Sequence, residues 1–91
     1  MIIDGNEVVV IPTPGHTSDS VSVRVRTKEG VVVISGDLFE KEEDLKDSKI
    51  WKDAGSENQI LQEENRQKIL AMADFVIPGH GEMFKVSTKK N

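Results

Sequence analysis

The two histidines of this chain stand in matching sequence contexts. Val-Ile-Pro-Thr-Pro-Gly precedes His16 and Val-Ile-Pro-Gly precedes His80, so each follows an apolar run, a proline and a glycine. A carboxylate, Asp37, follows a third apolar run at Ser35-Gly36. Imidazole and carboxylate groups are ligands that suit zinc, iron or manganese. We therefore take His16, Asp37 and His80 as candidate metal ligands, delivered by three strand ends to one edge of a sheet.

Each of these residues also has a plain structural interpretation. A histidine in a loop commonly bonds to a nearby carbonyl group, and an aspartate after a strand commonly caps a turn. For one isolated histidine we would favour that interpretation. Two histidines in matching contexts, together with Gly36-Asp37 after a strand, favour the metal site instead.

The strands that must position these residues are predicted by hydrophobic patterning. Residues 31–34 form an unbroken β-branched run, which is typical of a strand covered on both faces. Strict alternation over residues 20–26 predicts a second strand with valines on a half-buried face and polar residues on a wet face. Residues 28–30 join the two in a hairpin. Shorter apolar strands at 8–11 and 75–77 precede the two histidines.

One main helix is expected between the last two strands. Ser56 and Gln59 fit a capping box, which predicts a helix from Glu57 to Met72. Its expected apolar stripe consists of Ile60, Leu61, Ile69, Met72 and Ala73. The preceding segment, residues 40–53, is charged and aperiodic, so we interpret it as a surface excursion with about one helical turn, attached to the body through Ile50 and Trp51.

Length and composition limit the remaining choices. Ninety-one residues predict a single domain, 1–91, with a turn at residues 4–6 and a frayed tail from Ser87 to Asn91. The chain has no cysteine, which excludes disulfides and thiolate metal sites. Its net charge of −4 argues against wrapping nucleic acid by charge alone. No signal peptide and no apolar run of membrane-spanning length is recognisable, so we expect no membrane partner and a cytoplasmic or nuclear location.

Four segments of the chain resemble, in order and spacing, the successive motifs of the metallo-β-lactamase fold superfamily. They are Thr13-Pro14-Gly15-His16-Thr17, Ser20-Val21-Ser22-Val23, Ser35-Gly36-Asp37-Leu38-Phe39 and Ile77-Pro78-Gly79-His80-Gly81. The resemblance runs over about residues 8–86. It implies an α/β fold, specifically half of an αββα sandwich, with a mainly antiparallel or mixed sheet and one main helix.

The resemblance also implies a hydrolytic site with two zinc ions, for which iron or manganese are alternatives. His16 would belong to the first metal and His80 to the second. Asp37 would bridge both metals, which makes it the implied catalytic residue. Members of this fold hydrolyse lactams, thioesters, other esters and phosphodiesters, and the resemblance extends to relatives associated with RNA cleavage. RNA or a small ester, thioester or lactam is therefore the expected substrate.

The principal metal motif of the superfamily, His-x-His-x-Asp-His, is absent from this sequence. In the superfamily that motif lies upstream, so the chain is expected to correspond to a C-terminal half. Each metal would have only two protein ligands here, whereas catalytic zinc sites normally have three plus a water. We therefore expect an enzyme part that is inactive alone. The alternative is a non-catalytic binding or assembly module derived from the fold.

A half sandwich would also leave an apolar sheet face uncovered. We expect either the N-terminal half of the same fold or, for the isolated chain, a second copy in a homodimer to cover this face.

Several polar residues have roles that the sequence leaves open. Thr17 and Ser35 are candidates for orienting His16 or Asp37, and equally for plain turn or strand hydroxyls. Arg24, Arg26 and Arg66 could contact phosphate, but we favour exposed faces that serve solubility. We expect Trp51 to anchor the core rather than to stack on substrate.

Overall fold

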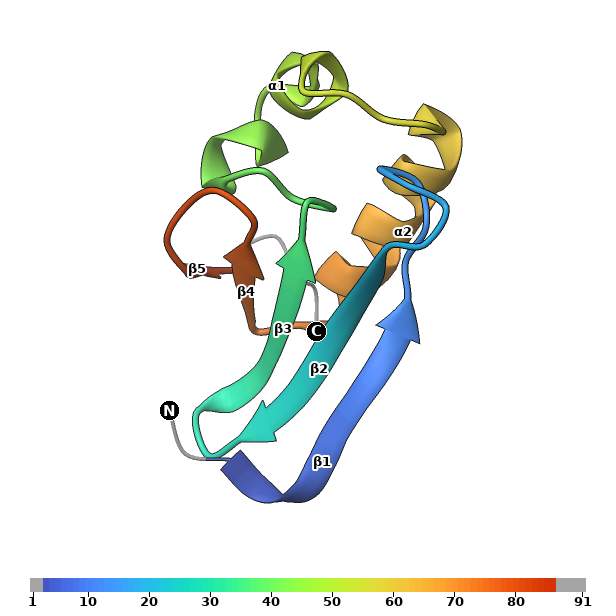
Figure 1. Ribbon diagram of the computed structural model, residues 1–91. Coiled ribbons are helices and arrows are strands. Elements are labelled where there is room, and N and C mark those ends of the chain that lie inside the picture. The colour runs from blue at the N-terminus through green and yellow to red at the C-terminus, as the bar shows by residue number, and fades with distance from the viewer. Residues whose placement is uncertain (1–2, 87–91) are drawn as a thin grey trace.

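The protein is a mixed α/β structure built on one five-stranded sheet (Figure 1). The computed structural model describes residues 3–86, and of residues 3–7 only the backbone. The strands are β1 (Ile3–Pro12), β2 (Val21–Thr27), β3 (Gly30–Gly36), β4 (Phe75–Pro78) and β5 (Phe84–Lys85). The helices are a 3₁₀ turn, η1 (Glu42–Leu45), the short α1 (Ser48–Asp53) and the long α2 (Gln59–Met72).

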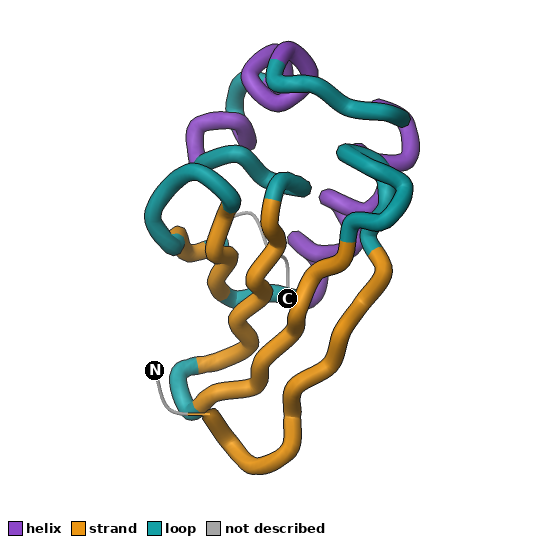
Figure 2. Tube along the Cα trace, viewed as in Figure 1, coloured by secondary structure: helices purple, strands orange, loops and turns teal. Residues whose placement is uncertain are grey.

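The strands lie in the sheet in sequence order, β1-β2-β3-β4-β5. All neighbouring pairs are antiparallel except β3 and β4, which are parallel. A parallel pair needs a long crossover connection. The segment that carries η1, α1 and α2 provides it, and α2 packs behind the sheet (Figures 1 and 2). This arrangement confirms the predicted fold class, a mixed sheet with one main helix.

The strand register divides the sheet into two faces, because directly paired residues point to the same side. Val33 pairs with Arg24 on β2 and with Val76 on β4. Val33 and Val76 are fully buried and belong to the core that α2 covers through Ile69. Among the described residues, the buried core cluster consists of Val33, Leu38, Phe39, Ile69, Ala73, Val76, Phe84 and Val86.

The opposite face of the sheet, which we call the outer face, is apolar. Its aligned positions on the first three strands are Val8, Val10, Val21, Val23, Val25, Val32 and Ile34. Val32 is buried, but Val10 is 62% and Ile34 is 41% exposed. The expectation that residues 31–34 are covered on both faces is therefore wrong at Ile34.

The division of residues 20–26 into a buried and a wet face is also wrong at one end. Val21 is 49% exposed, whereas Ser22 is fully buried. The buried hydroxyl of Ser22 is satisfied by that of Thr13 at 2.8 Å, at the start of the segment that carries His16. Val25 is buried as expected.

Helix α2 begins later than predicted. Its N-cap is Asn58, whose side chain accepts a hydrogen bond from the backbone N–H of Leu61 at 2.9 Å. Ser56 instead donates its hydroxyl to the carbonyl of Gly15, so the predicted capping box is wrong. The predicted stripe is also wrong at Ile60, which is 76% exposed.

Three other predicted boundaries change. The turn expected at residues 4–6 lies inside β1, where the pairing with β2 has an irregularity. Residues 40–53 form η1 and α1 rather than one turn, with Trp51 buried as expected. The short strand β5 was not predicted, and the tail from Ser87 to Asn91 lies outside the described residues.

Candidate metal centre

His16, Asp37 and His80 converge at one edge of the sheet. The strands β1, β3 and β4 run in the same direction, because β1 and β3 are both antiparallel to β2 and β4 is parallel to β3. Their carboxyl ends therefore meet at one edge, and each is followed by one of these three residues. His16 Nε2 lies 3.5 Å from Asp37 Oδ2, and His80 Nε2 lies 3.1 Å from Asp37 Oδ1. Asp37 thus faces one histidine with each carboxylate oxygen.

Glycine is required next to this carboxylate. A Cβ atom at position 79 would collide with Oδ1 of Asp37, so any other residue there would displace the carboxylate or the loop. Gly15 is equally constrained, because it has φ of +148° and a Cβ there would collide with the backbone of Gln62 on α2. The glycines before both histidines therefore permit close approach, one to the site and the other to the helix.

A fourth residue, Glu40, lies at the site and is not among the predicted ligands. Its Oε1 lies 3.6 Å from His80 Nε2. Asp37, Glu40 and His80 each offer one potential ligand atom, and these three atoms all lie within 4.8 Å of one another. The only signal in the sequence was a carboxylate three residues after Asp37, in a segment that we interpreted as surface.

Backbone hydrogen bonds hold Glu40 beside His80. The N–H of His80 donates to the carbonyl of Glu40 at 2.8 Å, and the N–H of Gly79 donates to the carbonyl of Phe39 at 2.9 Å. These bonds join the segment after β3 to the segment after β4. The proximity of Glu40 to His80 therefore follows from backbone pairing as well as from side-chain attraction.

Helix α2 fixes the two loops through its polar side chains. Asn65 donates to the carbonyl of Pro14 at 2.8 Å, in the loop that carries His16. Gln62 and Arg66 donate to the carbonyl of Leu38 at 3.2 and 2.9 Å, directly after Asp37. All three side chains are buried. This polar face of α2 therefore orients the segments that carry the candidate ligands.

Arg66 also forms a buried ion pair. Its guanidinium group lies 2.9 Å from Asp44 Oδ1 and packs on the rings of Phe39 and Trp51, with centroids at 4.4 and 4.8 Å. Asp44 Oδ2 in turn accepts the backbone N–H of Glu40 at 2.7 Å. Both earlier interpretations of Arg66, phosphate contact and solubility, are therefore wrong, because its guanidinium group is sealed in the interior.

The hydroxyl groups considered for orienting the ligands bond elsewhere. Thr17 pairs with the hydroxyl of Ser20 at 2.8 Å, and Ser35 donates to the carbonyl of Ile77 at 3.3 Å. Within residues 3–86, Nδ1 of His16 is buried without a hydrogen-bond partner. A histidine that binds a metal through Nε2 carries its proton on Nδ1, and that proton needs an acceptor. His16 therefore suits a metal ion less well than the group formed by Asp37, Glu40 and His80.

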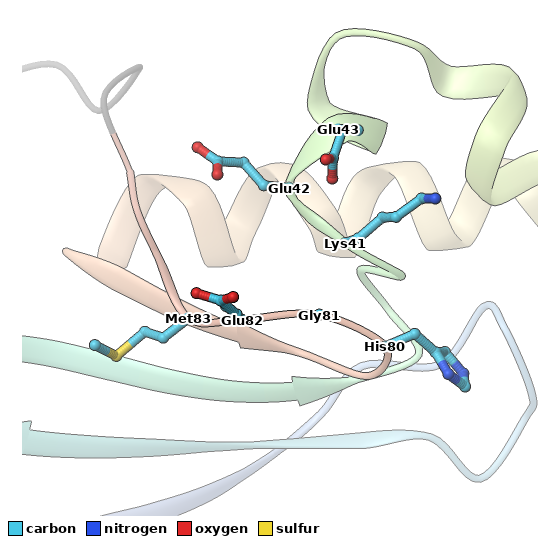
Figure 3. A pocket seen from close by; sticks show the side chains of 7 residues that line it. All are labelled: Lys41, Glu42, Glu43, His80, Gly81, Glu82 and Met83. Carbon is cyan, nitrogen blue, oxygen red and sulfur yellow. The ribbon is translucent and has the colours of Figure 1, made fainter.

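A pocket of about 350 Å³ adjoins His80. Figure 3 shows Lys41, Glu42 and Glu43 on one side and Glu82 on the other, with His80 and Met83 at opposite ends. Carboxylates thus dominate the polar lining of this pocket.

The helices in the described part of the chain are too short or too polar to span a membrane.

Comparison with known proteins gives a consistent result. The family model described as "Metallo-beta-lactamase superfamily" matches residues 1–80. A Xenopus laevis protein named metallo-beta-lactamase domain-containing protein 1 is 47% identical over 83 residues, which cover 90% of this chain and 34% of that protein. The human protein of the same name is 45% identical over 84 residues, covering 90% of this chain and 30% of its own length. The chain thus spans about a third of the length of these relatives.

A solved structure shares the fold. It is an N-acyl homoserine lactone hydrolase with the product N-hexanoyl-L-homoserine bound at its catalytic metal centre. The TM-score is 0.63 at 20% identity, and the match covers 84% of this chain and 31% of the other.

Proposed function

Because the chain belongs to the metallo-β-lactamase superfamily, we propose that it supplies part of the metal site of a hydrolase with two zinc ions. One observation carries this proposal, namely that Asp37 faces His16 with one carboxylate oxygen and His80 with the other. A carboxylate with an imidazole at each oxygen is suited to bridging two ions. In this proposal His16 and Asp37 hold the first ion, and Asp37 and His80 hold the second.

The donor set and the surrounding chain suit such ions. Imidazole and carboxylate ligands are those that zinc takes in proteins. When bound, the ions would lower the pKa of a water so that hydroxide exists near neutral pH. The protein's own contribution is to fix the ligands. Gly79 leaves room for the Asp37 carboxylate. Gln62 and Arg66 bind the carbonyl of Leu38, the next residue.

The chain alone is proposed to lack substantial hydrolytic activity. The pairs His16–Asp37 and Asp37–His80 give each zinc two ligands, and catalytic zinc normally has three protein ligands plus a water. For the complete enzyme, we propose an RNA phosphodiester as the first substrate class to test. Lactams, thioesters and other esters, lactones included, form the second class.

Metal analysis combined with turnover tests this function. We expect the purified chain to bind Zn²⁺ weakly, Asp37→Asn to weaken that binding further, and turnover of RNA and of a chromogenic lactam to stay at background. Turnover that disappears in Asp37→Ala would show that the chain is an active hydrolase by itself. A chain that binds no Zn²⁺ at all would favour the alternative, a non-catalytic binding or assembly module.

For the partner, we propose that a second copy covers the outer face of the sheet when this chain is alone. The support for this proposal is the exposure of apolar side chains on that face, among them Val8, Val10, Val21 and Ile34. In a longer protein such as the relatives, the N-terminal half of the fold would take this place.

A further inference from the structure

The side chain of Glu40 is largely buried, although that of its partner is exposed. The Glu40 side chain is 13% exposed, whereas that of His80 is 64% exposed. Among the described residues, the one ionic partner of this carboxylate is Nε2 of His80, at 3.6 Å. A carboxylate removed from water needs a compensating charge or hydrogen bonds, because burial of an isolated charge is costly.

The His80 nitrogen cannot donate a strong hydrogen bond to both of the carboxylate oxygens beside it. His80 Nε2 lies 3.1 Å from Asp37 Oδ1 and 3.6 Å from Glu40 Oε1. It carries at most one proton, so it can donate one strong hydrogen bond. The two carboxylates meanwhile lie close enough to repel each other, since their ligand atoms and that of His80 are within 4.8 Å. A divalent cation among the three atoms would satisfy both oxygens and the nitrogen together.

We infer that Glu40 is the third protein ligand of a divalent cation held by Asp37, Glu40 and His80, so that this chain binds one cation without any upstream residue. The inference rests on the proposed metal site at Asp37 and His80, and raises its donor count from two to three. The donors are one imidazole and two carboxylates, a set that suits Zn²⁺ or Mn²⁺.

The backbone around Glu40 is fixed, which supports ligation rather than a chance encounter. Its N–H donates to the buried carboxylate of Asp44, and its carbonyl accepts from His80. Asp44 is itself held by Arg66. The backbone that carries this side chain is therefore fixed before the cation arrives, which reduces the backbone entropy lost on binding.

Zn²⁺ titration of the 91-residue chain by isothermal calorimetry tests this inference, with Mn²⁺ as a second probe. We expect Glu40→Gln to weaken Zn²⁺ affinity at least tenfold. The matched control is Glu42→Gln, which removes the same charge from the same segment at an exposed position. It should change the affinity less than twofold.

The outcomes separate this inference from the proposed function. If Asp37→Asn weakens binding but Glu40→Gln does not, Glu40 is not a ligand and the proposed site stands. If Asp37→Asn also binds like the wild type, the proposed site itself fails. Equal losses in Glu40→Gln and Glu42→Gln would overturn the inference, because they would indicate a general charge effect.

A measurement on the unmodified chain covers the case in which Glu40→Gln does not fold. We expect saturating Zn²⁺ to shift the carboxyl ¹³C NMR signals of Asp37 and Glu40, and the signal of Glu42 to stay in place. An unchanged Glu40 signal beside a shifted Asp37 signal would exclude Glu40 from the metal.

Discussion

The Asp37 carboxylate occupies the space that a side chain at position 79 would need. A Cβ at Gly79 would collide with Oδ1 of Asp37, and the backbone carbonyl of Gly36 lies 3.1 Å from the same point. The Gly36 backbone leaves an added Cβ little freedom to shift, so the clash would be relieved by displacing the Asp37 carboxylate. At the residue scale, the glycine before the second histidine therefore preserves the position of a candidate ligand.

We expect Gly79→Ala to lower Zn²⁺ affinity about tenfold or more, because loss of ligand orientation typically has effects of this size. The measurement is the same calorimetric titration. Gly81→Ala is the control in the same loop, where the nearest atom to an added Cβ is the exposed Lys41 side chain at 3.1 Å. If both variants bind Zn²⁺ like the wild type, Asp37 is not held by this contact.

At the scale of elements, helix α2 acts as the common support of both site loops. Its buried side chains Gln62, Asn65 and Arg66 bind carbonyl groups from the segments after β1 and β3. Those carbonyl groups belong to irregular backbone, which has no partner strand to bond with. The polar helix face therefore completes the hydrogen bonding of the loops and orients His16 and Asp37 at the same time.

We expect Arg66→Met to destabilise the fold by about 3–5 kcal/mol, because it leaves the carboxylate of Asp44 buried without its cation. Urea unfolding followed by circular dichroism measures the change. The double variant Arg66→Met/Asp44→Asn should be no less stable than Arg66→Met, since removal of the second charge ends the penalty. Additive losses from the two substitutions would show that the residues contribute independently.

At the scale of the whole molecule, the two faces of the sheet differ in how they are covered. Helix α2 and the segment after β3 bury one face around Val33 and Val76. The outer face exposes apolar side chains, of which Val10, at 62%, is the most exposed among those that the structure describes. Such a surface favours association, because burial of apolar area is the main driving force for it.

We expect the isolated chain to sediment as a dimer, with about twice its mass of 10.1 kDa. Val10→Lys should shift it to a monomer, because the dimer would bury an unpaired charge at that position. Ile60→Lys, an exposed site on α2 away from the outer face, should leave the dimer intact. A wild-type chain that is monomeric at micromolar concentration would refute the proposed dimer.

The sequence by itself predicted the cores of four strands and the positions of the three candidate ligands at strand ends, but it missed β5 and one end of the face division in β2. Unbroken and alternating valine patterns indicate a strand, since side chains alternate between its faces, but they did not reveal that one apolar face stays exposed. The Gly-His and Gly-Asp positions after apolar runs predicted that His16, Asp37 and His80 lie at strand ends. The motifs also predicted the superfamily, because four ordered segments are specific where each alone is not.

Only the tertiary structure decided the roles of Glu40, Asp44 and Arg66. Each is a charged residue in a charged segment or on a helix surface, and local sequence cannot distinguish a solvated charge from a buried one. Whether a charge is buried depends on which distant groups the fold brings near it. Hydrogen bonds between two loop backbones bring His80 to Glu40, and Asp44 pairs with Arg66, 22 residues further along the chain. These contacts exist only after the crossover segment has packed on the sheet, so no pattern of neighbouring residues could reveal them.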